Sequence, residues 1–214
     1  MQITPNIYQV DDTVGGVFLI VDDAYLSLVD SGVPQSDDKI LAQIIALGRK
    51  PTDLKHILVT HSDGDHIGAL PALVAASHAQ VYAQADEAAV VTGQHKSRGG
   101  QMVMVAQAVP VSRIIKEGDV LPLHGGIRVV ESFGHTTGHV CFHLLAQNLL
   151  FAGDCINNTQ GLKGANPQYT LNMEQANATV KQLATLGVDS ICFGHGPAII
   201  GGAAAQLRQL AEAL

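Results

Sequence analysis

The sequence has no long apolar run and no leader-like amino terminus. Nowhere do about 18 consecutive apolar residues occur, which is roughly the length that a membrane-spanning helix needs. Residues 1–6 also lack the basic stretch and following apolar stretch that form a secretory signal. We therefore expect a cytoplasmic protein that does not associate with a membrane.

Charged residues are also scarce. They make up 14% of the chain against 47% hydrophobic residues, whereas disordered chains show the opposite balance. The 12 Lys and Arg residues are scattered and the formal net charge is -7, so no basic stripe is present to neutralise phosphates. These values argue against nucleic acid as a partner, and we expect a small-molecule substrate instead. With 214 residues, we expect a single domain over residues 1–214.

Cysteines are few and odd in number. Cys141, Cys155 and Cys192 are widely spaced, and each lies in or beside an apolar run. We expect buried free thiols, which suit a reducing compartment because secreted domains tend to pair their cysteines. Cys155 directly follows a candidate site residue, but its side chain is expected to pack in the core on the other side of the backbone.

Apolar periodicity predicts strands and helices that alternate in two halves of the chain. Strands are expected at residues 7–10, 17–21, 25–29, 56–60, 80–83, 127–131, 140–145, 149–152 and 190–193. Helices are expected at residues 36–47, 68–77, 85–91, 173–186 and 203–214. The order favours an α/β architecture of two mixed sheets with helices outside. Residues 92–101 are polar and glycine-rich, and we expect a mobile surface loop there that can form part of a lid.

The densest set of metal-binding side chains lies between Thr60 and His66. The segment reads Thr-His-Ser-Asp-Gly-Asp-His and directly follows the apolar residues 57–59. A loop leaving a strand end can direct alternate side chains to a common centre. His61 and Asp63 can then converge on one ion while Asp65 and His66 turn to another.

Three further candidates follow apolar stretches and lie next to glycine. His135 belongs to the segment Gly-His-Thr-Thr-Gly-His, Asp154 follows Gly153, and His195 follows Gly194. Loops at strand ends are where parallel sheets build sites, and glycine permits the tight turns that direct a side chain inward. Spacing alone allows these residues to form a site but does not prove it.

Together the four motifs resemble the metallo-β-lactamase superfamily, whose pattern is T-H-x-H-x-D-H, G-H-T-x-G-H, G-D and G-H in this order. The resemblance covers nearly the whole chain and implies a four-layer αββα sandwich. It also implies seven metal ligands: His61, Asp63 and His135 for one ion, Asp65, His66 and His195 for a second ion, and Asp154 as a bridge.

Asp63 departs from this pattern because it stands where the family usually has its second histidine. An anionic oxygen replaces a neutral nitrogen, which favours harder ions. Two divalent ions are expected, with zinc first and iron or manganese as alternatives. The flavodiiron proteins of the same superfamily have a glutamate here, but they carry an additional flavodoxin domain.

The resemblance implies a hydrolase in which two cations activate a water molecule. The short chain and the G-H-T-x-G-H segment look more like the glyoxalase II and lactonase branches than nucleases, so we expect a small ester, thioester or lactone as the substrate. Asp65 is the expected proton acceptor, and Tyr169 is an expected substrate contact. A di-iron redox enzyme and a non-catalytic metal-binding module remain alternatives.

Two further points stay open at the level of sequence. His139 ends the G-H-T-x-G-H segment, and it is expected either to hydrogen-bond behind a metal ligand or to hold its own turn. No stretch stands out as an apolar interface helix, so a homodimer is only one alternative for the oligomeric state.

Overall fold

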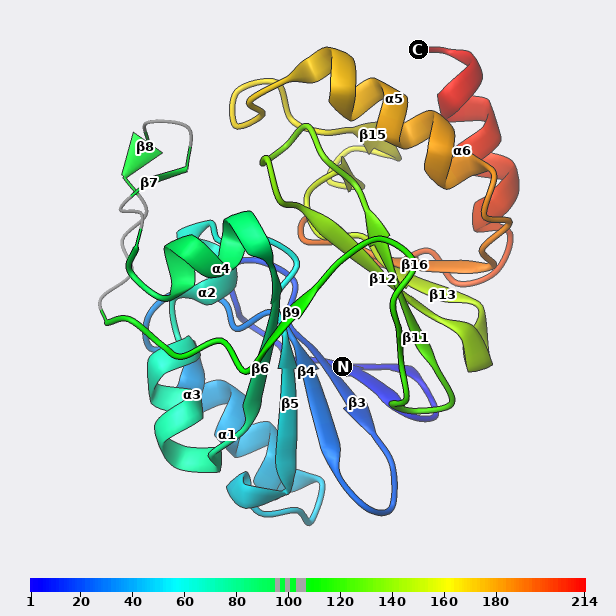
Figure 1. Cartoon of the computed structure of the whole chain (residues 1–214). Coiled ribbons are helices and arrows are strands. Elements are labelled where there is room, and N and C mark those ends of the chain that lie inside the picture. The colour runs from blue at the N-terminus through cyan, green and yellow to red at the C-terminus, as the bar shows by residue number, and fades with distance from the viewer. Residues whose placement is uncertain (95–96, 99–100, 103–106) are drawn as a thin grey trace. The chain divides into compact units, whose positions relative to one another are not determined.

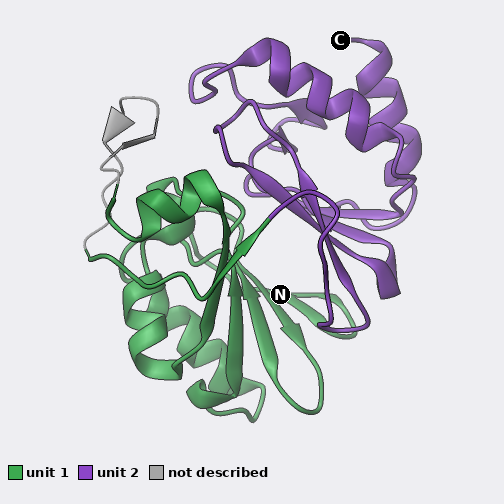
Figure 2. Cartoon of the chain, viewed as in Figure 1, with its two compact units in different colours: residues 1–115 green, residues 116–214 purple. Residues whose placement is uncertain are grey.

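The computed structural model describes residues 1–94, 97–98, 101–102 and 107–214 (Figure 1). The chain divides into two compact units, unit 1 at residues 1–115 and unit 2 at residues 116–214 (Figure 2). Each unit contains one large mixed sheet with helices of its own. The prediction of a single domain over the whole chain stays a prediction.

Unit 1 is built on a seven-stranded sheet with the order β1-β2-β3-β4-β5-β6-β9. The first four strands are antiparallel, and β4, β5, β6 and β9 run parallel to one another. The strands are β1 (Gln2–Thr4), β2 (Ile7–Gln9), β3 (Phe18–Val21), β4 (Leu26–Val29), β5 (Leu54–Leu58), β6 (Gln80–Gln84) and β9 (Arg113–Ile115). β4 is buried along its whole length, as expected for a short continuous apolar run in the middle of a sheet.

The helices of unit 1 are α1 (Ser36–Ala46), α2 (Gly64–Ile67), α3 (Leu70–Ser77) and α4 (Ala85–Val91), with the 3-10 turn η1 (Pro51–Asp53). α1 and α3 lie side by side against one face of the sheet (Figure 1). Ile40 and Ile44 of α1 pack with Leu70 and Leu73 of α3 and with the strands in one buried core. Asp37 favours the start of α1 because its charge opposes the helix dipole.

Unit 2 is built on a five-stranded sheet with the order β10-β11-β12-β13-β16. Its elements are β10 (Val120–Leu121), β11 (Ile127–Glu131), β12 (Val140–Leu144), η2 (Leu145–Gln147), β13 (Leu149–Phe151), β14 (Ile156–Asn157), β15 (Lys163–Gly164), α5 (Met173–Ala184), β16 (Ser190–Cys192) and α6 (Ala203–Glu212). β13 and β16 are parallel, and the other neighbours in the large sheet are antiparallel. α5 and α6 lie side by side (Figure 1), and Val180 and Leu207 pack with Leu150 and Ile191 of the sheet.

Most expected elements are confirmed, and the differences concern short segments. The segment expected to be a loop after β5 contains the one-turn helix α2. Short strands such as β1, β9 and β10 were not expected, because two or three residues carry too little periodicity. Within the loop predicted at residues 92–101, residues 95–96 and 99–100 lie outside the described residues, and the short strands β7 (Ser97–Arg98) and β8 (Gln101–Met102) pair with each other. Among the described residues, no helix combines the length and the apolar character needed to cross a membrane.

Candidate metal centre

In unit 1 the candidate ligands follow β5, beside the end of a parallel neighbour. Val29 of β4 pairs with Leu58 of β5, so the segments that follow both strands begin at the same end of the sheet. Asp30 follows β4, and the segment from His61 to His66 follows β5. This arrangement places the unit 1 cluster, defined as His61, Asp63, Asp65 and His66, where parallel sheets build their sites.

Asp30 supports the cluster through hydrogen bonds to Thr60 and His66. This residue was not identified from the sequence. Its Oδ1 accepts a hydrogen bond from the Thr60 amide at 2.8 Å, and its Oδ2 accepts one from the Thr60 hydroxyl at 2.6 Å. The same Oδ2 lies 2.8 Å from Nδ1 of His66. The side chain is buried and its backbone has a φ of 58°, a conformation that few residues other than glycine adopt. The position of this aspartate, between an apolar strand and Gly32, was the one feature of the sequence that could have indicated a role at the site.

These hydrogen bonds fix the protons of the two histidines. The Thr60 hydroxyl donates to Asp30, so its oxygen accepts from Nδ1 of His61 at 3.0 Å. Asp30 can only accept when ionised, so Nδ1 of His66 donates to it. Both rings therefore carry a proton on Nδ1, so the neutral form of each presents an unprotonated Nε2. Their centroids are 4.0 Å apart.

The two carboxylates of the cluster face these Nε2 atoms. Oδ2 of Asp63 lies 3.5 Å from Nε2 of His61, and Oδ2 of Asp65 lies 3.7 Å from Nε2 of His66. Asp63 precedes α2 and makes no capping hydrogen bond with its side chain. Its backbone carbonyl accepts the helix bonds from His66 and Ile67 instead, which leaves the carboxylate directed to His61. The predicted pairs His61–Asp63 and Asp65–His66 are both brought together.

A buried acid holds the segment between these ligands. Glu87 of α4 accepts hydrogen bonds from the amide of Ser62 at 2.8 Å and from its hydroxyl at 2.5 Å. The carbonyl of His66 accepts from the amide and hydroxyl of Ser31, at 2.7 and 2.9 Å. Both contacts join distant segments, and nothing in the local sequence pattern pointed to them.

In unit 2 the candidate ligands lie at the ends of two parallel neighbours. Phe151 of β13 pairs with Cys192 of β16, so Asp154 and His195 follow the strands at the same end of the sheet. Nε2 of His195 lies 3.2 Å from Oδ2 of Asp154. The His195 side chain is 38% exposed, whereas that of Asp154 is only 12% exposed.

His135 completes the unit 2 cluster, defined as His135, Asp154 and His195. Its Nε2 lies 3.6 Å from the same Oδ2 of Asp154, so one carboxylate oxygen faces two imidazoles. Nδ1 of His135 lies 3.3 Å from the hydroxyl of Thr170, which itself donates to the carbonyl of Asn166 at 2.7 Å. The Thr170 oxygen is therefore an acceptor, and His135 also carries its proton on Nδ1.

The chemistry of both clusters fits divalent metal ions. With metal–ligand distances of about 2.1 Å, two donors on one tetrahedral ion are about 3.4 Å apart. The four nitrogen–oxygen distances within the clusters run from 3.2 to 3.7 Å. Metal-binding histidines normally donate from the other ring nitrogen to a supporting group, as His61, His66 and His135 do here.

The other residues singled out in the sequence are an exposed tyrosine and three buried cysteines. Tyr169 lies in the loop between β15 and α5 and is 51% exposed. The prediction of buried free thiols is confirmed for Cys141, Cys155 and Cys192. Burial raises the pKa of the Cys155 thiol well above its ordinary value, and burial also raises that of Cys192. Both cysteines therefore stay protonated at neutral pH.

Comparison with known proteins gives the family. The family model of the metallo-β-lactamase superfamily matches residues 10–195. A probable metallo-hydrolase of Bacillus subtilis, YflN, is 26% identical over 201 residues, which cover 81% of this chain and 76% of that protein. A hydroxyacylglutathione hydrolase of Rhizobium meliloti is 33% identical over 112 residues, which cover 52% of this chain and only 37% of that protein.

A solved structure supports the predicted fold. BJP-1, a subclass B3 metallo-β-lactamase of Bradyrhizobium japonicum, has a TM-score of 0.78 at 24% identity, covering all of this chain and 90% of that one. This likeness confirms the α/β class and the metallo-β-lactamase fold. The superfamily generally binds divalent metals, often zinc, and the donor sets described above agree with that. The chain belongs to the metallo-β-lactamase superfamily and is a hydrolase of that superfamily.

Proposed function

We propose that this chain binds two divalent metal ions and hydrolyses a small ester, thioester or lactone. The proposed ligands are His61, Asp63, Asp65, His66, His135, Asp154 and His195. Zinc is the first expectation for both ions, and iron and manganese are the alternatives because Asp63 contributes a hard oxygen donor.

One observation carries this proposal. In His61, His66 and His135 the proton is held on Nδ1 by Thr60, Asp30 and Thr170, and each Nε2 faces a carboxylate oxygen. In an ordinary polar turn, no neighbouring groups are required to fix the Nδ1 proton of a histidine and to direct its Nε2 toward a carboxylate. Three such histidines in the motifs of a metal-binding superfamily support a metal centre.

The side chains of the clusters have separate tasks in the proposed reaction. A pair of divalent ions, when bound, supplies Lewis acidity that lowers the pKa of water and polarises an acyl oxygen. Asp65 is the proposed proton acceptor, because its carboxylate is 28% exposed and can exchange a proton with solvent. Asp30 and Thr60 hold the His61 and His66 rings in place while the charge at the centre changes.

The substrate class rests on the relatives. Several of them are hydroxyacylglutathione hydrolases, and this chain spans about half of their length or less, so their substrates are a guide to the chemical class only. Tyr169 is a proposed substrate contact because it is exposed in the loop whose residue Thr170 supports His135. The cytoplasmic location and the oligomeric state stay predictions.

Metal analysis of protein purified without added metal tests this proposal, together with a hydrolysis panel of lactones, thioesters and phosphodiesters. We expect two equivalents of zinc or manganese and turnover of one acyl class. The test variant is Asp154→Asn, which should keep the fold but lose bound metal and turnover. A wild-type protein without bound metal, or full activity and metal content in Asp154→Asn, would contradict the proposal.

The di-iron alternative is favoured by one specific feature. Asp63 brings a carboxylate to 3.5 Å from Nε2 of His61, where the family pattern has a histidine. Anaerobic purification followed by oxygen and nitric oxide consumption assays separates the two chemistries. Two irons and rapid consumption would replace hydrolysis by redox chemistry, whereas zinc without redox turnover would remove this alternative.

A further inference from the structure

A network of buried hydrogen bonds connects the loop of His135 with the backbone of Asp154. Its members are Ser132, His139 and Cys141, and the side chains of all three are fully buried. Nδ1 of His139 lies 2.7 Å from the Ser132 hydroxyl, and Nε2 of His139 accepts the amide hydrogen of Asp154 at 3.0 Å. The proposed function assigns no role to this hydrogen-bond network.

The proton positions follow from the partners. A backbone amide can only donate, so Nε2 of His139 carries no proton and Nδ1 carries it instead. The Ser132 oxygen then accepts from Nδ1 of His139, and it also accepts from the Cys141 thiol at 3.3 Å. The Ser132 hydroxyl hydrogen is directed to the carbonyl of His139 at 3.3 Å. Ser132 thereby holds one tautomer of His139.

The same histidine also touches the second ligand of unit 2. The Ser132 amide donates to the His139 carbonyl at 2.9 Å, which closes the turn that carries His135. The His135 and His139 rings meet edge to face, with centroids 5.9 Å apart and planes at 88°. His139 therefore contacts the ring of one proposed ligand and the backbone of another.

We propose that His139 is a positioning residue that fixes Asp154 and His135 for metal binding, and that Ser132 selects the tautomer it needs. Its consequence for metal binding rests on the proposed function. The tautomer and the hydrogen bond to Asp154 are properties of unit 2 itself.

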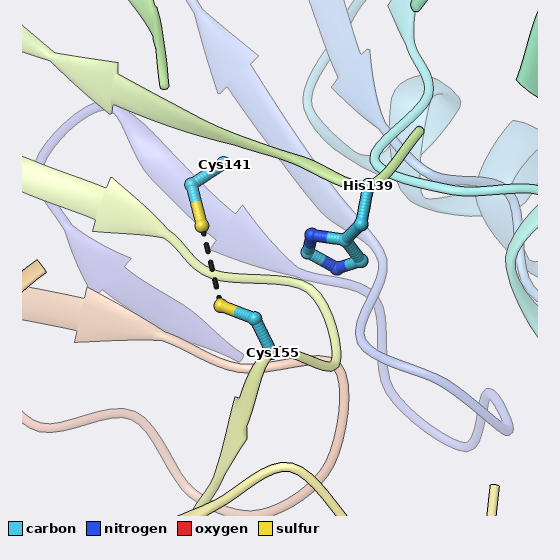
Figure 3. Close-up of side chains that lie close together, drawn as sticks. All are labelled: His139, Cys141 and Cys155. Atoms are coloured by element: carbon cyan, nitrogen blue, oxygen red, sulfur yellow. Dashed lines mark hydrogen bonds between the residues drawn. The ribbon is translucent and has the colours of Figure 1, made fainter. Parts of the chain in front are cut away.

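A different reading takes His139, Cys141 and Cys155 as a metal site of their own. Figure 3 shows the two thiols facing each other beside the His139 ring. Their sulfurs are 3.4 Å apart. Both nitrogens of His139 already have protein partners, however. The Cys155 thiol donates to the Ala152 carbonyl at 3.1 Å, and the Cys141 thiol donates to Ser132. These contacts favour a supporting role over ligation.

Nitrogen-15 NMR of metal-free protein labelled in histidine tests the tautomer. We expect the His139 ring, assigned by its loss in His139→Gln, to show a protonated Nδ1 and an unprotonated Nε2 between pH 7 and 8. In Ser132→Ala the ring loses its acceptor, and the two tautomers should then be mixed. A protonated Nε2 in the wild-type protein would overturn the proposal without reference to any metal.

Metal binding to matched variants tests the positioning role. Glutamine can place an amide oxygen near the position of Nε2 and accept from Asp154, whereas leucine fills the space without an acceptor. Zn²⁺ affinity, measured by competition with a chromophoric chelator, should fall about 10- to 100-fold in His139→Leu and recover largely in His139→Gln. The visible spectrum of the Co²⁺ form should change in His139→Leu and stay close to wild type in His139→Gln.

His143 supplies the control. It is buried on β12, and its Nε2 lies 2.9 Å from Oδ1 of Asn148. Among the described residues no hydrogen bond joins its ring to a proposed ligand, so His143→Leu removes a buried histidine outside the proposed centre. His143→Leu should leave Zn²⁺ affinity unchanged, even where it lowers the melting temperature.

The outcomes separate this proposal from the proposed function. Wild-type protein that takes up no Zn²⁺ contradicts the proposed function, while the NMR result still decides the tautomer. Wild-type protein that binds Zn²⁺ no more tightly than His139→Leu overturns only the positioning role. A near-ultraviolet thiolate band in the Co²⁺ form that disappears in Cys155→Ala would show that the thiol cluster itself binds metal, and would also overturn it.

Discussion

Among single residues, the supporting groups decide what the candidate ligands can do. Asp30, Thr60 and Thr170 each accept a hydrogen bond from Nδ1 of a histidine, so the neutral ring carries its lone pair on Nε2. His139 has the same tautomer, but its Nε2 accepts a hydrogen bond from the Asp154 amide instead of facing a carboxylate. The partner of Nε2 therefore separates a ligand histidine from a supporting one.

Asp30→Asn tests the support of the unit 1 cluster. Asparagine keeps the size of the side chain and tolerates the positive φ, but its amide group would point a donor at two other donors, the Thr60 hydroxyl and Nδ1 of His66. Zn²⁺ affinity should fall about 10- to 100-fold. The measurement is a chelator competition, with the exposed Asp38→Asn as the control. Unchanged affinity in Asp30→Asn would show that His66 needs no fixed tautomer.

A second prediction concerns the pH dependence of folding stability through His56. Burial lowers the pKa of this half-buried histidine, and the nearby charge of Lys55 lowers it further. The unfolded chain takes up this proton near pH 6.5, whereas the folded protein does so at lower pH. As the pH falls below about 6.5, the unfolded state binds more protons and stability is lost.

The check is a comparison of urea denaturation between pH 7.5 and pH 5 in the presence of EDTA. His56→Gln cannot take up the proton, so its free energy of unfolding should fall less steeply than that of the wild type on acidification. The difference between the two slopes isolates His56, because every other titrating group is common to both proteins. Parallel slopes would contradict the prediction.

The candidate ligands could be predicted from the sequence because they lie in short local motifs. Asp63 and Asp65 are within five residues of His61 and His66, and glycine marks His135, Asp154 and His195. Asp30 and Glu87 could not be found in this way. They reach the cluster from 25 to 36 residues away, and only the pairing of β4 with β5 and the packing of α4 bring them there.

At the level of secondary structure elements, strand ends explain why the motifs gather. β4 and β5 are parallel in unit 1, and β13 and β16 are parallel in unit 2, so the segments that follow them leave each sheet at one end. The long apolar strands and amphipathic helices were predictable from periodicity. α2 was not, because its four residues, Gly64–Ile67, are too few to show a helical repeat and begin with glycine.

Gly134 joins β11 to the turn of His135 and tests how tightly this turn is held. Its φ is 124°, and a Cβ there would lie 2.3 Å from the Ala176 amide nitrogen in α5. Gly134→Ala should therefore displace α5 or the turn and destabilise unit 2 by at least about 2 kcal/mol, because the strained backbone alone costs about 1 to 3 kcal/mol.

Gly187→Ala is the matched control. Gly187 also has a positive φ, of 66°, but no heavy atom lies within 4 Å of the position of its Cβ. The substitution should cost only about 1 to 2 kcal/mol, the usual penalty for a left-handed residue with a Cβ. Urea denaturation of both variants makes the comparison. Equal losses would mean that the contact with α5 contributes nothing to the effect of Gly134→Ala.

For the whole molecule, metal binding and folding should be linked. A ligand that binds only the folded state stabilises it, by about 2.7 kcal/mol at a hundredfold excess over the dissociation constant. The ligands proposed here come from segments that are far apart in the sequence, so an unfolded chain should bind Zn²⁺ much more weakly. The melting temperature should therefore rise with free Zn²⁺ and return to its initial value when EDTA is added.

Asp154→Asn decides whether this stabilisation comes from the proposed centre. One oxygen of Asp154 faces both His135 and His195, so the variant should lose most of the Zn²⁺-dependent rise in melting temperature while its melting temperature in EDTA changes little. Asp189→Asn, an exposed change elsewhere in unit 2, should keep the full rise. If Asp154→Asn and wild type respond equally to Zn²⁺, the ion binds elsewhere, and the ligand set proposed here is wrong.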